Sequence, residues 1–148
     1  MRPMKMTMRF AAPPKKTFEV CADFRNADKR IKNIKRIEIL TDGPIRKGTR
    51  FRETRVMFNR ECTEEMELVE FQPDSSYTLG CASCGAEWRH RFEFAADGNG
   101  GTVVNLEMSC RAVSLFAKLM SPLGALFAGS LKKCVQQDLG DLRKVIES

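Results

Sequence analysis

Two alternating runs, residues 49–57 and 60–71, are separated only by Phe58-Asn59, and this spacing constrains the fold more than any other feature. Alternation of apolar and polar residues is typical of strands buried on one face, and a two-residue connection joins antiparallel strands. With Phe58-Asn59 as the turn, Phe51 lies opposite Met66. The sequence therefore predicts a hairpin of defined register, because a slip of one residue would exchange its two faces.

The predicted register gives the hairpin one charged face and one largely apolar face. On the charged face Arg50 lies opposite Glu67 and Arg52 lies opposite Glu65, as expected of a surface in contact with solvent. The other face, which we expect to point inward, carries the apolar residues Phe51, Met57, Cys62, Met66 and Leu68.

Three charged residues, Glu53, Arg55 and Glu64, share the inward face with these apolar residues. Charges are costly to bury unless they are paired, so their presence requires a reason. One reason is the polar end of a ligand pocket. The other is an ion pair at the rim of the sheet that only fixes the register, and the sequence leaves both open.

Further strands are indicated by short alternating runs between turn signals such as Asp42-Gly43-Pro44. Because the connections from the second strand onward are short, neighbouring strands are expected to be antiparallel. The additional strands are predicted at residues 5–10, 37–40, 77–83, 88–94 and 102–110.

His90, the only histidine of the chain, shares its face of the strand 88–94 with Trp88, Phe92 and Phe94. An inward histidine in an aromatic row is either a satisfied core group or, since its ordinary pKa lies near neutrality, a general acid or base. Both interpretations stay open.

Two short helices are predicted after the first strand. Pro14 suits the first turn of a helix over residues 15–22, and a second helix over 28–34 has Ile31 and Ile34 facing inward. Together with the strands they define the N-terminal half of the fold.

A long amphipathic helix is predicted over residues 114–147, with a break at Ser121-Pro122. Its apolar stripe is what a helix lying on a sheet requires. Asp138 falls on this stripe, and we expect it either to be neutralised by a nearby base or to cap another element, in both cases a structural role.

The chain of 148 residues is predicted to form a single domain, 1–148, with the composition of a globular protein. No signal peptide or consistently apolar span is recognised, so a cytoplasmic location is expected.

The charge is unevenly distributed along the chain. Residues 1–60 hold 17 Lys/Arg against 6 Asp/Glu, whereas residues 61–148 hold 8 against 13. Without interleaved aromatics or a nucleic-acid motif, the basic half is interpreted as a solvated surface, and no nucleic-acid partner is expected.

Six cysteines without a secretory signal favour free thiols in a reducing compartment, where they act as small core residues. Cys81 and Cys84 form a single C-x-x-C. A structural zinc site needs four ligands, and neither a second pair nor a pair of histidines is present. We therefore predict no metal and no cofactor.

Several short stretches are informative in their order along the chain: Phe18-Glu19-Val20 with Ala22-Asp23, Gly48-Thr49-Arg50-Phe51 with Glu53-Thr54-Arg55, Gly100-Gly101-Thr102, and Asp138-Leu139 with Leu142-Arg143. In this order they resemble the START/polyketide-cyclase superfamily (SRPBCC proteins). The resemblance implies an α+β helix-grip fold: a seven-stranded curved antiparallel sheet wrapped around a long C-terminal helix, with a cavity between them for apolar ligands.

Three functions fit this fold, since membership alone does not decide the chemistry. The first is binding of a hydrophobic small molecule such as a lipid or polyketide. The second is a polyketide cyclase or dehydratase, in which Glu53, Glu64 or His90 moves protons while Arg55 stabilises an enolate-like oxygen. The third is a lipid protein at a membrane surface, which uses the basic region 25–50.

The candidate catalytic residues are thus Glu53, Arg55, Glu64 and His90. The expected partner is a hydrophobic ligand, and the sequence leaves monomer and homodimer both open. The predicted ligand-binding residues are Phe51, Met57, Cys62, Met66, Tyr77, Trp88, Phe92, Met108, Leu123, Phe127 and Leu131.

Overall fold

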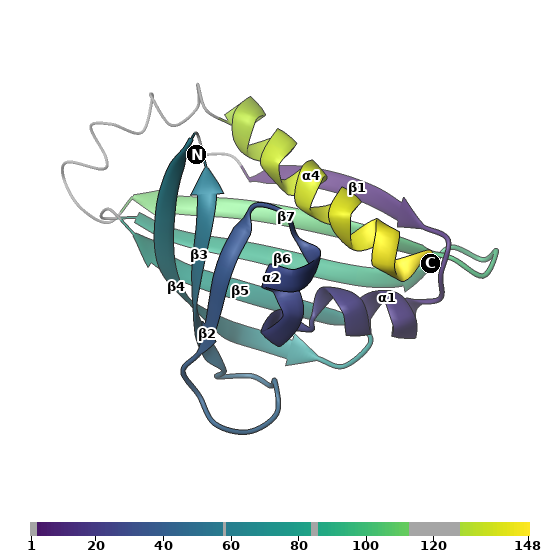
Figure 1. Ribbon diagram of the computed structural model, residues 1–148. Coiled ribbons are helices and arrows are strands. Elements are labelled where there is room, and N and C mark those ends of the chain that lie inside the picture. Colours follow the sequence, from purple (N-terminus) through teal and green to yellow (C-terminus); the bar gives the residue numbers. More distant parts are fainter. Residues whose placement is uncertain (1–2, 58, 84–85, 113–127) are drawn as a thin grey trace.

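The computed structural model describes residues 3–57, 59–83, 86–112 and 128–148. Within these residues the chain forms seven strands, short helices after the first strand, and a long C-terminal helix (Figure 1). The strands are β1 (Met4–Phe10), β2 (Ile34–Ile39), β3 (Arg50–Met57), β4 (Arg60–Gln72), β5 (Ser76–Ser83), β6 (Ala86–Ala96) and β7 (Thr102–Ala112). The helices are α1 (Pro14–Cys21), the 3-10 helix η1 (Phe24–Asn26), α2 (Ala27–Arg30) and α4 (Ala128–Ile146).

These strands form one antiparallel sheet in the order β1-β7-β6-β5-β4-β3-β2. From β2 to β7 each strand pairs with the next in sequence, as the short connections predict. The hairpin register is confirmed, with Phe51 opposite Met66 and Glu53 opposite Glu64. Asn59 has a φ of 62°, the left-handed conformation that asparagine tolerates in a tight turn.

The outer face of the β3–β4 hairpin is charged, as predicted, but neither arginine pairs with the glutamate that lies opposite it in the hairpin. Arg52 Nη1 lies 2.9 Å from Glu38 Oε2, which is directly opposite it on the other neighbouring strand, β2. Arg50 pairs with Glu65, a diagonal neighbour that a long side chain on a twisted sheet can reach. The exposed pairs therefore connect three adjacent strands.

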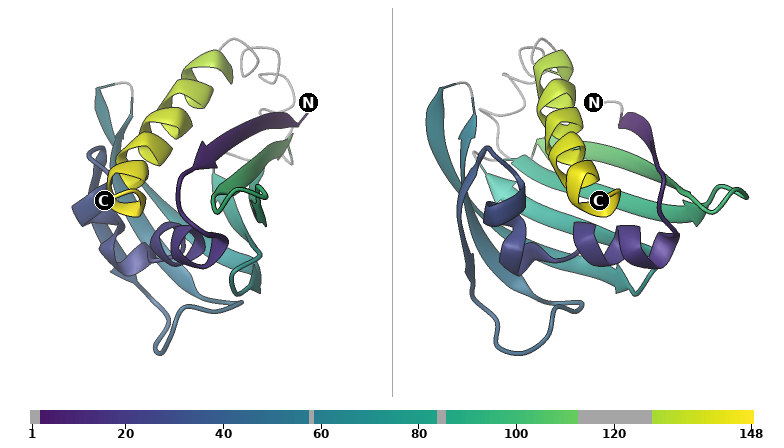
Figure 2. Two further views of the ribbon diagram at one scale, coloured as in Figure 1. Left: turned by 90° about the vertical axis from the view of Figure 1, so that its right-hand side faces the viewer. Right: turned by 45° about the vertical axis from the view of Figure 1, so that its right-hand side comes forward.

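The described helices lie on the concave side of the curved sheet, and none of them covers the convex side (Figure 2). Pro14 occupies the first turn of α1, as predicted. The Phe18 ring of α1 makes edge-on contacts with three rings of the sheet, at centroid distances of 5.1–5.8 Å. Those rings belong to Phe71, Tyr77 and Phe94. Side chains therefore fill the concave face beneath α1.

The C-terminal half of α4 is attached firmly to the rest of the molecule. The Arg143 guanidinium lies 4.9 Å from the centre of the Phe10 ring and donates to the backbone carbonyl of Arg9. The backbone N–H of Ala11 donates to Glu147 at 2.8 Å. The buried side chains described for α4 are Leu139, Leu142 and Ile146.

The second predicted helix has different bounds in the structure. The helix predicted over 28–34 ends at Arg30, and Ile34 already belongs to β2. Ile31 and Ile34 are buried, as predicted, but Ile31 is extended with ψ of 116°, a conformation that suits a β-branched residue. The break predicted at Ser121-Pro122 lies outside the described residues.

Candidate functional site

Charged residues of β3 and α4 meet on the concave face. Arg55 Nη2 donates to Asp138 Oδ2 at 2.6 Å, and Arg55 Nε lies 3.5 Å from Glu53 Oε2. Only 15% of the Arg55 and Asp138 side chains and 11% of the Glu53 side chain are exposed. Asp138 is therefore neutralised by a nearby base, as predicted. We call Glu53, Arg55 and Asp138 the Arg55 cluster.

Burial dominates the electrostatics of the Arg55 cluster. It raises the pKa of Glu53 and of Asp138 above the ordinary carboxyl range, although the Arg55 guanidinium opposes both shifts. Burial by itself lowers the pKa of Arg55, but the two carboxylates outweigh it and the pKa is raised. Arg55 Nε and Asp138 Oδ1 are buried and have no hydrogen-bond partner among the residues that the structure describes. The cluster is thus paired in charge but incompletely satisfied in hydrogen bonds.

Glu64 extends this polar region onto the next strand, where it lies opposite Glu53. Its Oε2 accepts a hydrogen bond from Cys81 Sγ of β5 at 3.6 Å. Sequence reasoning missed this contact because Cys81 is paired in register with Met66, so Glu64 is reached diagonally. Glu53, Arg55 and Glu64, predicted as a set, are thus brought together.

The thiols do not act uniformly as core residues. Cys21 is buried, as predicted, whereas Cys62 is exposed. Cys62 lies near the turn of the β3–β4 hairpin, where its neighbours in β4 are exposed as well, so the prediction was wrong there. Burial and the Glu64 carboxylate raise the pKa of the Cys81 thiol to about 12, which keeps it protonated.

Among the described residues no group of three His, Cys, Asp or Glu side chains is arranged to hold a metal ion. Cys84, the partner of Cys81 in the C-x-x-C, lies outside those residues.

His90 lies on the concave face between Leu79 of β5 and Met108 of β7. Burial, assisted by the positive charge of Arg55, lowers its pKa from 6.5 to about 4. The imidazole is therefore neutral near pH 7, where it can exchange hydrogen bonds but is a weak general base.

The predicted lining residues differ in depth. Phe51, Tyr77 and Met108 are closed into the core, with 1%, 3% and 4% of their surface exposed. The Phe51 ring, for example, is stacked on Phe24 of η1 at 5.0 Å. The lining residues of the concave face that remain partly exposed are Met66, Trp88 and Phe92.

Four predicted lining residues are not placed by the structure. Leu123 and Phe127 lie outside the described residues, and the side chains of Met57 and Leu131 are not described. Their assignment to the pocket stays a prediction.

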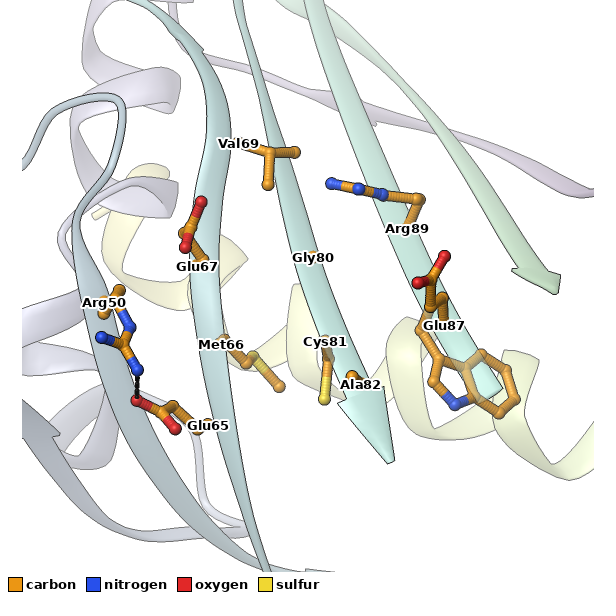
Figure 3. Close-up of a pocket in the computed structure, with 11 residues that line it drawn as sticks. Arg50, Glu65, Met66, Glu67, Val69, Gly80, Cys81, Ala82, Glu87 and Arg89 are labelled. Atoms are coloured by element: carbon orange, nitrogen blue, oxygen red, sulfur yellow. Dashed lines mark hydrogen bonds and ion pairs between the residues drawn. The ribbon is translucent and has the colours of Figure 1, made fainter. Parts of the chain in front are cut away.

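The convex face carries a shallow depression of about 320 Å³ around Gly80 (Figure 3). Its rim holds the Arg50–Glu65 ion pair, Glu67 and Arg89. A second depression, of about 300 Å³, crosses the outer face of β1, β7 and β6. Charged side chains surround both depressions; Met66, Cys81 and Trp88 also border the first, although their register with Phe51 places them on the concave face. Neither depression has the apolar character of the predicted pocket on that face.

Solved structures share this fold over nearly the whole chain. A START superfamily protein from Mycobacterium smegmatis has a TM-score of 0.76 and 14% identity, covering 97% of this chain and 98% of that one. The Zhui aromatase/cyclase from Streptomyces gives a TM-score of 0.74 at 15% identity, covering 99% and 93%. Norcoclaurine synthase from Thalictrum flavum gives 0.72 at 13%, covering 98% and 93%.

These similarities show the fold, an α+β helix-grip architecture, as the sequence predicted. The chain belongs to the family described as polyketide cyclase / dehydrase and lipid transport, whose model matches residues 1–147. A comparison with curated proteins gave no match. Among the described helices, none is both long and apolar enough to cross a membrane.

Proposed function

We propose that this protein binds a hydrophobic small molecule between the concave face of its sheet and α4. One observation carries the proposal: apolar side chains that point to the interior side of the sheet are not fully covered. Met66, Trp88 and Phe92 stay partly exposed, whereas Tyr77 and Phe94 on the same face are closed by α1. An apolar ligand would remove this remaining surface from water, which is the main driving force for such binding.

The Arg55 cluster supplies polar groups beside this apolar surface. Apolar pockets commonly fix the orientation of a ligand through a few convergent polar side chains. Glu64 and His90 lie on the same concave face and add an acceptor and a neutral imidazole. The ligand class that fits is therefore an apolar body with a polar group at one end. The family description, which includes lipid transport and polyketide chemistry, supports the same class.

Native mass spectrometry of freshly purified protein tests the proposal directly. We expect a fraction of the molecules to carry a small-molecule adduct that is released on denaturation, and the same spectrum reports the oligomeric state. Trp88, the only tryptophan of the chain, gives a second readout. Its emission should transfer to anilinonaphthalene sulfonate bound at the concave face.

Two matched substitutions on β4 separate the concave from the convex face. Met66→Glu places a charge on the concave face and should weaken probe binding by about tenfold or more. Val69→Glu places the same charge beside the convex depression, where Val69 is partly exposed, and should change binding by no more than about twofold. Equal effects of the two substitutions, or no binding of adduct or probe, would overturn the proposal.

A cyclase or dehydratase activity is the second candidate, favoured by the paired Glu53 and Arg55 beside an apolar surface. In this function Glu53 or Glu64 moves a proton and Arg55 stabilises the negative oxygen of an enolate-like intermediate. The raised pKa of Glu53 suits a carboxyl that exchanges a proton closer to neutrality than usual.

The enzymatic candidate is tested with an aromatic-forming polyketone substrate. Turnover should fall in Glu53→Gln and Arg55→Met, each first shown by circular dichroism to be folded. His90→Phe completes the set, and unchanged turnover in all three variants would exclude this function.

A further inference from the structure

Basic residues gather along one edge of the molecule that the proposed ligand site does not use. Residues 25–47 hold eight Lys/Arg against three Asp/Glu. This segment comprises most of η1, then α2, the edge strand β2 and the loop that leads to β3 (Figure 1). Six of its cations are exposed and form no ion pair within the described residues: Arg25, Lys29, Lys32, Lys35, Arg36 and Arg46. We call this set the basic edge.

Two arginines of the basic edge, Arg25 and Arg46, are held by backbone oxygens rather than by carboxylates. Arg46 Nη1 donates to the carbonyls of Asp42 and Pro44 at 3.0 and 2.9 Å. Arg25 donates to the carbonyl of Gly43, which ties η1 to the same loop. These contacts position the guanidinium groups while leaving their positive charge uncompensated.

Acidic residues are too few to balance the cations of this segment, and two of those in or beside it pair with arginines that are not in the basic edge. Glu38 of β2 pairs with Arg52 at 2.9 Å, and Asp23 pairs with Arg30 at 3.1 Å. The segment therefore presents a net positive surface toward solvent. Such a surface attracts anionic partners over about a Debye length.

The apolar groups of this edge favour a lipid surface over a nucleic acid. Leu40, at the start of the loop, is 37% exposed, and Pro44 within the loop is exposed as well. Base stacking needs an exposed aromatic ring, but Phe24 and Phe51 are buried against each other. Exposed apolar residues beside cations are instead what the interface of an anionic bilayer accommodates.

We propose that the basic edge, with Leu40 and Pro44 of the β2–β3 loop, docks this protein on the surface of an anionic membrane. The cations lie against the lipid headgroups, and the loop residues reach the boundary of the acyl region. This surface is distinct from the concave site, so docking does not depend on the ligand proposed there.

Cosedimentation of the purified chain with vesicles tests the docking. We expect retention on phosphatidylcholine vesicles that contain phosphatidylserine at about 0.05 M salt, and release at about 0.5 M salt, where charges are screened. Vesicles of phosphatidylcholine alone should retain much less protein. Absence of retention on the anionic vesicles at low salt would overturn the proposal.

Two double charge reversals locate the surface. Lys29→Glu with Lys35→Glu should weaken vesicle binding by about tenfold or more. Lys5→Glu with Arg9→Glu changes the net charge equally but lies on exposed positions of β1, the opposite edge strand of the sheet, and should reduce binding far less. Equal losses would indicate a net-charge effect and reject the basic edge as the surface.

A third substitution and a competitor complete the experiment. Leu40→Ser should reduce binding while leaving its salt dependence unchanged, because it removes apolar contact and no charge. Every variant should have the same melting curve and the same circular dichroism spectrum as the parent protein, so that a loss of binding does not reflect unfolding. If single-stranded RNA displaces the protein from vesicles and binds it more tightly, the edge is a nucleic-acid surface and the membrane proposal fails.

Discussion

Removal of the Arg55 guanidinium should be among the most damaging single changes on the sheet. In Arg55→Met the carboxyls of Glu53 and Asp138 stay 85–89% buried but lose their counter-charge. Breaking a buried ion pair by deleting one partner generally costs 3–5 kcal/mol, and the partial exposure here reduces this to about 3 kcal/mol. For a chain of this size the melting temperature should fall by roughly 9 °C.

The loss should depend on pH with a defined sign. Without Arg55, the folded-state pKa values of both carboxyls rise further above their unfolded values. A carboxyl whose pKa is higher in the folded than in the unfolded state binds its proton more tightly when the protein is folded. Protonation therefore favours the folded state at low pH, and this stability is lost as the pH rises through the folded-state pKa. The difference in unfolding free energy between parent and Arg55→Met should therefore be largest near neutrality and shrink in mild acid. Addition of Asp138→Asn to Arg55→Met should recover part of the stability.

Arg52→Met provides the matched control, since Arg52 lies on the same strand but faces outward. Its pair with Glu38 is 45% and 55% exposed, and such surface pairs contribute about 0.5 kcal/mol or less. Urea denaturation at several pH values measures both variants. If Arg55→Met loses no more than Arg52→Met, or if its loss is the same at every pH, the reasoning about the buried cluster is refuted.

Three further outcomes can be checked. The carbon-bound proton resonances of His90 should not titrate between about pH 6 and 8, because its pKa is lowered to about 4; a midpoint near 6.5 in an NMR titration would contradict its burial. Cys62 should react with a thiol reagent in the native protein while Cys21, buried and with a pKa of about 12, reacts only on unfolding, as peptide mapping will show. Gly101→Ala should destabilise the protein by about 2 kcal/mol or more, because the added Cβ would lie 2.6 Å from a backbone carbonyl oxygen of β1. Gly140→Ala, in open space on α4, should instead stabilise it by about 0.5 kcal/mol. Calorimetry that ranks the two variants in the reverse order would refute this.

The periodicity of the sequence predicts faces well. A two-residue turn at Phe58-Asn59 sets the complete β3–β4 register, and with it the meeting of Glu53 and Glu64. Asp138 could be placed opposite a base because an acid on an apolar helix stripe requires one. Pro14 likewise identifies the beginning of α1.

Depth and diagonal contacts are what the sequence does not predict. Alternation places Phe51 and Met66 on one face equally, yet only Phe51 is closed by η1, since coverage depends on where each helix lies. The identity of the base at Asp138 required the tertiary structure, because α4 and β3 are far apart in the chain. The Cys81–Glu64 contact depends in the same way on geometry across strands.

The attachment of α4 has a mechanical consequence. Near its C-terminus Arg143 contacts Arg9 and Phe10 at the end of β1, Glu147 accepts from Ala11, and Ile146 is fully buried. Asp138, near the middle of α4, is held to β3 by Arg55. The sheet is hydrogen-bonded from edge to edge, so a larger guest would be accommodated by displacement of the first turns of α4, which precede the Arg55 contact. The size of molecule that the protein admits would then be governed by how far the N-terminal half of one helix can move away from the sheet.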